Sequence, residues 1–173
     1  TSSASGSSVT YNKSKAGTYG TLYLESSTGK YLYVANASSV DAIPSGTNPS
    51  ESFTFSVTDS IATTTTSYTV NITGANEAPT LASVTSGSVA DQANSSTLGT
   101  TSNLYGTLSG SDTDTGTTLT YDISGSSSAS YTSSASGSSV TYNKSKAGTY
   151  GTLYLESSTG KYLYVANASS VDA

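Results

Sequence analysis

Residues 18–36 read TYGTLYLESSTGKYLYVAN, two alternating runs of apolar and polar residues joined by SSTG. Such alternation is typical of half-buried β-strands, and a short connection containing glycine indicates a hairpin. The stretch therefore predicts antiparallel strands at 18–25 and 30–36. We expect its tyrosines to pack across the hairpin, with a carbohydrate-binding platform as the alternative. They are Tyr19, Tyr23, Tyr31 and Tyr33.

This hairpin belongs to a duplicated segment. Residues 1–42 recur without a single change at 132–173, an offset of 131 residues. Because solenoid repeats are only about 20–50 residues long, this offset indicates a repeated domain. We interpret the chain as a window of a tandem array with a 131-residue period, slightly longer than one unit. A duplication introduced by cloning is the alternative.

The composition excludes several classes of function. Serine and threonine provide 69 of the 173 residues, only 10% are charged, and the net charge is −5. Histidine, cysteine and arginine are absent, so thiol or imidazole catalysis and a His/Cys zinc site are excluded. We expect no enzymatic activity. An acidic chain without a basic cluster is not expected to bind nucleic acid, and no apolar run approaches the roughly 18 residues of a membrane span.

The rest of the chain continues the β pattern. We expect loops at 43–50 and 59–66, a linker at 74–79, and a short helical turn within 35–42. Seven to nine short strands in a 131-residue period predict an all-β fold, an antiparallel β-sandwich. The further strands are expected at 8–11, 52–58, 67–73, 80–89, 104–109, 117–124 and 139–142.

The expected core consists of the apolar residues that alternate along these strands. Phe53, Phe55 and Val57 share one face at a period of two, so all three are expected to point inward. The full set is Leu22, Leu24, Phe53, Phe55, Val57, Val70, Ile72, Leu108, Leu119, Tyr121, Ile123, Val140, Leu153 and Leu155.

Three stretches together resemble the VCBS repeat, a cadherin-like module of giant bacterial surface proteins exported by type I secretion. Residues 16–33 (AGTYGTLYLESSTGKYLY) are similar to the family's YGTL hairpin. Residues 52–79 contain SFTFSVTD, YTVNITG and NEAP, which resemble its last two strands and its linker. Residues 105–125 (YGTLSGSDTDTGTTLTYDISG) resemble its aspartate-rich segment. The resemblance implies a sandwich of the cadherin or immunoglobulin type.

The resemblance also implies a frame for the units. In this family the linker motif opens a unit, so residues 1–76 would be the C-terminal portion of one unit and residues 77–173 the N-terminal portion of the next. The second portion then lacks its closing hairpin. We therefore expect residues 43–76 of one molecule to complete residues 77–173 of another by strand exchange. The expected partners are neighbouring units of the same protein.

A calcium site is expected from oxygen ligands. Asp112 and Asp114 alternate in the turn SDTDTG, and closely spaced carboxylates suit Ca²⁺. Asp59, Asn76 and Glu77 lie at a strand end or in the linker, where cadherin-like modules bind ions between domains. Solvated turn carboxylates are the alternative, and Glu77 stands where the family's linker usually has aspartate.

The resemblance implies a structural extender repeat in a large secreted adhesin, located outside the cell on the bacterial surface and mediating attachment. One alternative is a sandwich module that binds carbohydrate or protein through its loops. Another is a subunit of a self-assembling surface fibre.

Overall fold

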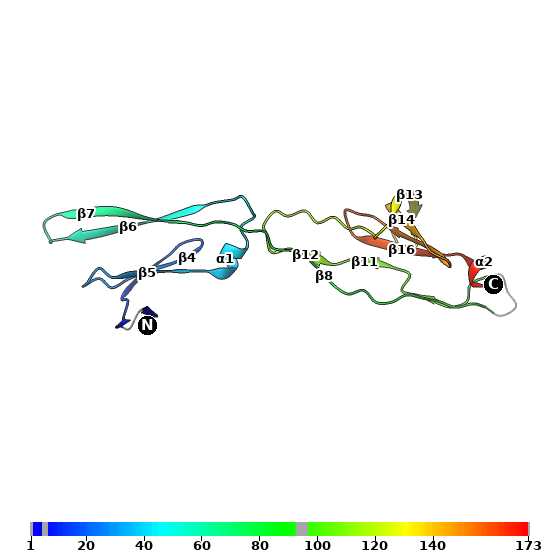
Figure 1. The fold of residues 1–173 in the computed structure, drawn as a ribbon, viewed down its shortest axis with the longest axis horizontal. Helices are drawn as coiled ribbons and strands as arrows, with labels where there is room; N and C mark the ends of the chain where they lie inside the picture. Colours follow the sequence, from blue (N-terminus) through cyan, green and yellow to red (C-terminus); the bar gives the residue numbers. More distant parts are fainter. Residues whose placement is uncertain (1, 5–6, 93–96, 173) are drawn as a thin grey trace. The chain divides into compact units, whose positions relative to one another are not determined.

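The computed structural model describes residues 2–4, 7–92 and 97–172. Within these residues the secondary structure is mainly antiparallel β, with two short helices, which confirms the predicted all-β class (Figure 1). No helix in this described part is long and apolar enough to cross a membrane.

The chain forms two compact units. The first consists of Thr1–Ala78 with Thr113–Gly116, and the second of Pro79–Asp112 with Thr117–Ala173. The repeat frame with a boundary between residues 76 and 77 stays a prediction.

The strands and helix of the first unit form two layers. β3, β4 and β5 make a three-stranded antiparallel sheet, and β6 pairs with β7 along nine residues. The elements are β1 (Ser2–Ala4), β2 (Ser7–Val9), β3 (Lys13–Ala16), β4 (Gly20–Leu24), β5 (Tyr31–Ala35), α1 (Ala37–Asp41), β6 (Ser50–Thr58) and β7 (Thr63–Asn71).

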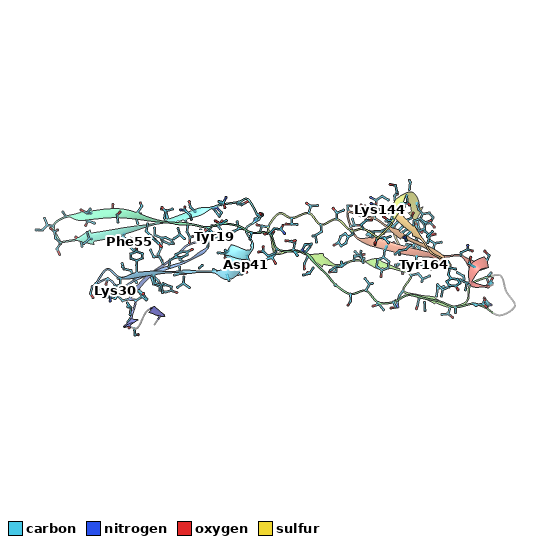
Figure 2. The ribbon with its side chains drawn as sticks, in the orientation of Figure 1. Tyr19, Lys30, Asp41, Phe55, Lys144 and Tyr164 are labelled. Atoms are coloured by element: carbon cyan, nitrogen blue, oxygen red, sulfur yellow. The ribbon has the colours of Figure 1, made fainter. Side chains whose placement is uncertain are left out.

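The β6–β7 hairpin packs on the three-stranded sheet through aromatic rings. The ring centroids of Tyr31 and Phe55 lie 5.1 Å apart, and those of Tyr33 and Phe53 lie 6.0 Å apart. Figure 2 shows Phe55 in the space between β6 and β5. The two layers of the first unit therefore meet at an aromatic interface. Such pairs favour tilted arrangements at 4.5–7 Å.

The second unit is built on a larger sheet in the order β11-β16-β15-β14-β13, with two small strand pairs, β8–β12 and β9–β10. Its buried cluster contains Val140, Tyr142 and Leu163. Its elements are β8 (Thr80–Leu81), β9 (Ser88–Val89), β10 (Thr101–Ser102), β11 (Tyr105–Thr107), β12 (Gly110–Ser111), β13 (Ser127–Ser133), β14 (Val140–Ala147), β15 (Gly151–Leu155), β16 (Lys161–Ala166) and α2 (Ala168–Val171).

The hairpin and the helical turn after it have the same local structure in both copies of the duplicated segment, whereas the separate β2 and β3 of the first copy correspond to one continuous strand, β14, in the second. The predicted hairpin is confirmed in both: Leu22 pairs with Tyr33 across β4 and β5, and Leu153 pairs with Tyr164 across β15 and β16. The predicted helical turn is also confirmed, as α1 and α2. The copies differ in their neighbours. The second gains β11 and β13 at its sheet edges, whereas the first is covered by β6 and β7.

The tyrosines pack as structural residues, but not against one another as expected. Tyr23 pairs with Leu32 and Tyr33 pairs with Leu22 across the hairpin. The rings of Tyr31 and Tyr33 instead contact the phenylalanines of β6. The alternation of the hairpin places Tyr23, Tyr31 and Tyr33 each opposite a leucine, so the direct ring pairs of our expectation are wrong.

The core prediction is confirmed at five positions and wrong at one. Val57 is 71% exposed because β6 extends toward its tip past Tyr31, the first residue of β5 and the ring partner of Phe55. The other expected core residues are half-buried. Buried core residues that the pattern missed are Ile43, Tyr142 and Leu163. The confirmed ones are Leu22, Phe53, Ile72, Val140 and Leu155.

Two strand predictions are wrong, and the strands β1, β3, β10, β12 and β13 were missed. Residues 63–66, which were expected in a loop, belong to β7. Residues 117–124 form no strand; Tyr121 instead accepts a hydrogen bond at its hydroxyl from the Gly110 amide, 3.1 Å away. Residues 80–89 are strand only at their two ends. β13 was missed because its residues are mainly serine, yet Tyr131 within it pairs with Tyr142.

Candidate functional site

Two of the five predicted calcium ligands meet in the first unit. Asp114 is buried, with 7% of its surface exposed, and a hydrogen bond joins its carboxyl group to that of Glu77. The backbone positions this turn: the amide and hydroxyl of Thr115 donate to the Ala42 carbonyl at 3.1 and 2.6 Å. That carbonyl follows α1, so the turn lies at the C-terminal end of this helix.

The environment of Glu77 disfavours its ionised form. Burial is the largest cause that raises its pKa. The charge of Asp114, the hydrogen bond to that carboxyl group and the charge of Asp41 raise the pKa further. Asp41, the last residue of α1, was missed because its approach depends on the fold. Together these carboxyl groups can hold a proton or attract a cation.

The other three predicted ligands have different surroundings. Asn76 donates its side-chain amide to the Glu77 carbonyl at 2.8 Å. Asp112 belongs to the second unit. Asp59 accepts from the amides of Ile61 and Ala62 at the β6–β7 turn, which holds its pKa below the usual range. Nine paired residues separate this turn from the other end of the hairpin, about 30 Å at the usual rise.

The calcium site stays a prediction. Among the described residues, no group of three or more His, Cys, Asp and Glu side chains is arranged to hold a metal ion. Oxygen ligands from the backbone and from asparagine also bind Ca²⁺. A calcium titration therefore tests whether the chain binds the ion.

A side chain outside the predicted site joins the layers of the first unit. Glu51 of β6 accepts hydrogen bonds from the amides of Thr18 and Tyr19 at 2.7 and 3.1 Å, and from the Tyr33 hydroxyl. A Cβ at Gly17 would lie only 2.2 Å from a Glu51 carboxylate oxygen. Glycine therefore permits the carboxylate to approach the backbone. We call Glu51 with its three donors the carboxylate clasp.

The carboxylate clasp alters the titration of both of its side chains. Burial opposes the ionised form of Glu51, but the bonds from Tyr33, Tyr19 and Thr18 outweigh it, so the pKa of Glu51 lies below its usual value. Burial, followed by the bond to Glu51 and its charge, raises the pKa of Tyr33 to about 12. The clasp thus contributes stability above the ordinary pKa of glutamate and loses it between about pH 10 and pH 12, as Tyr33 ionises.

Sequence reasoning missed the carboxylate clasp although one signal was present. Glu51 is the only charged residue of β6 and β7, whose other residues are apolar, hydroxyl-bearing or amide. A single carboxylate on such a hairpin indicates a specific partner. Nothing in the local pattern identifies that partner, because it lies more than thirty residues earlier in the chain.

Replacing Glu77 with glutamine is expected to raise the melting temperature of the first unit at pH 7. Because the pKa of Glu77 is raised, the folded state disfavours ionisation, and stability is lost as the pH rises through that pKa. The gain should shrink toward pH 4, near the ordinary glutamate pKa of about 4.3. Scanning calorimetry measures it.

Calcium should act on the same groups. Millimolar Ca²⁺, the range of weak extracellular sites, is expected to raise the melting temperature of the wild-type chain and leave that of Glu77→Gln unchanged. Glu25→Gln is the control. Turn hydrogen bonds from Thr28 and Ser27 lower the pKa of Glu25 to about 2, so removing this carboxylate should lower the melting temperature at pH 7. A lower melting temperature for Glu77→Gln at pH 7, or no calcium shift in the wild type, would contradict these expectations.

Comparisons with protein-family models, with curated proteins and with solved structures found no match to this chain.

Proposed function

We propose that this chain is part of a structural extender in a secreted bacterial surface adhesin, where tandem sandwich units hold an adhesive region away from the cell. The supporting observation is that one 42-residue sequence, repeated at an offset of 131 residues, forms a hairpin with the same strand register in two separate compact units. A hairpin that recurs with one register at a fixed spacing is what a repetitive spacer requires.

The surface chemistry supports a spacer role. Most strand positions that face solvent carry serine or threonine, as along β7, where Thr63–Ser67 are all exposed. Such a surface offers hydrogen bonds to water and few charges or apolar patches through which parallel copies would adhere. Extension would then follow from units joined end to end by short linkers, each unit adding a constant length.

The extender proposal makes a measurable claim about length. Chains carrying two, four and eight complete 131-residue units should show a maximum dimension in small-angle X-ray scattering that grows in proportion to the number of units. Compaction, with a dimension that grows much more slowly, would contradict the proposal. Binding of a single unit to particular sugars on a glycan array would instead favour a carbohydrate-binding module.

A further inference from the structure

We propose that an apolar groove in the second unit is a docking site for the β6–β7 hairpin of a second copy of this chain. The groove encloses about 700 Å³ between the sheet and the segment that contains β8 and β9. From the sheet, it is lined by Leu153, Leu155, Tyr162 and Tyr164.

The first unit shows what covers these residues. The offset of 131 residues relates the four sheet residues of the groove to Leu22, Leu24, Tyr31 and Tyr33. In the first unit, the rings of Phe53 and Phe55 contact the two tyrosines of this set. Since sequence and register are the same in both copies, the groove opens onto part of the face that β6 covers in the first unit. Leu155 at its base is 1% exposed, and Leu104, Leu108 and Ile123 of the same unit line the groove beside it.

The polar groups of the carboxylate clasp are repeated as well. Its donors correspond to the amides of Thr149 and Tyr150 and to the Tyr164 hydroxyl. Within the described residues no carboxylate bonds to these three donors, and Tyr150 is 59% exposed. The second unit thus offers a hairpin both apolar contacts and the hydrogen bonds that fix its register.

The wall of the groove provides further contact. Residues 84–87 line it without forming a strand, and Leu81 and Val84 on this wall are 61% and 55% exposed. An unpaired segment next to an apolar face can add a strand from another chain. A hairpin bound here could therefore contact Leu81 and Val84 as well as the sheet.

Docking between copies is heterologous, because the hairpin of one molecule binds the groove of the next. Such contacts generate either closed rings or open chains, and in both cases the mean mass should rise with concentration. Each docked hairpin leaves its own first unit, which makes the two identical faces competitors for one occupant. The inference goes beyond the extender role: a failure to associate would overturn it and leave the length measurement unaffected.

Two glycines provide a matched test with opposite results. A Cβ at Gly17 would collide with Glu51, whereas at Gly148 the nearest atom is the Gly151 carbonyl oxygen at 3.5 Å, an ordinary contact. Gly17→Ala should release the hairpin from the first unit and promote association. Gly148→Ala should leave the isolated chain folded and prevent Glu51 of a second copy from docking.

Multi-angle light scattering over a concentration series measures both effects. The wild type should show a mass that rises with concentration, Gly17→Ala should associate at lower concentrations, and Gly148→Ala should need concentrations at least about tenfold higher. If Gly148→Ala does not fold, Tyr164→Phe, which removes one donor and no packing, takes its place, with Tyr33→Phe as its counterpart. Monomers at all concentrations for the wild type and Gly17→Ala, or equal effects of the two glycine variants, would overturn the proposal.

Discussion

Replacing Phe53 with alanine is expected to unfold the first unit and leave the unfolding transition of the second unit in place. Phe53 is 7% exposed, and its ring packs against Tyr33, the residue that also bonds to Glu51. Removing a buried phenylalanine costs about 3–5 kcal/mol. That is comparable with the about 5–15 kcal/mol that stabilises a whole domain. Amide exchange across β6 and β7 measures the loss, because these strands occur once in the chain.

The matched control lies four residues further along β6. Val57 alternates on the same face but is 71% exposed, so Val57→Ala should change the free energy of unfolding by less than about 0.5 kcal/mol. Comparable losses for the two variants would show that β6 is not held on the sheet through Phe53. The description of the first unit as two packed layers would then be wrong.

The second large effect is expected from adding a hairpin rather than removing one. A longer chain, in which a second copy of residues 43–76 follows Ala173, should have a more stable second unit. The added hairpin can fill the groove within the same molecule, at the spacing that the 131-residue period dictates. If it contributes about what its Phe53 equivalent alone contributes, the gain is about 3 kcal/mol or more.

A gain of this size is easily measured by calorimetry. At about 4–8 °C for each kcal/mol in a unit of this size, the transition of the second unit should move up by at least about 10 °C. The control is the same extension with alanine at the position that corresponds to Phe53, which should give a much smaller shift. The extension should also suppress association between molecules, because the groove is filled.

Local features of this fold were predictable from the sequence, and contacts between layers were not. The hairpin of β4 and β5 follows from alternation and a glycine turn, both of which act within twenty residues. Long-range contacts decide burial. Tyr11 and Tyr142 occupy the same position of the duplicated segment, yet Tyr11 is half-buried and Tyr142 is 1% exposed. Tyr131, one residue before the second copy begins, contributes to that difference.

In the candidate site, too, local features were predictable from the sequence and contacts between distant residues were not. Glu77 and Asp114 were predicted as ligands of one site, and the structure brings them into contact. Asp59 was grouped with them because it lies at a strand end, but it satisfies the amides of its own turn. Asp41 and Glu51 were missed, since each acts on residues that are distant in the sequence and close only after folding.

We infer that the duplicated sheet is completed by a β6–β7 hairpin, in the first unit by its own and in the second by a further copy. The amides of Thr149 and Tyr150 test it most directly, because Thr18 and Tyr19 report on the same groups with the hairpin in place. NMR hydrogen exchange on the unextended chain, in which the environments of the two pairs differ, gives the reference rates. In the chain extended by residues 43–76, the Thr149 and Tyr150 amides are expected to become as protected as those of Thr18 and Tyr19. Unchanged, rapid exchange of these two amides in the extended chain would contradict it.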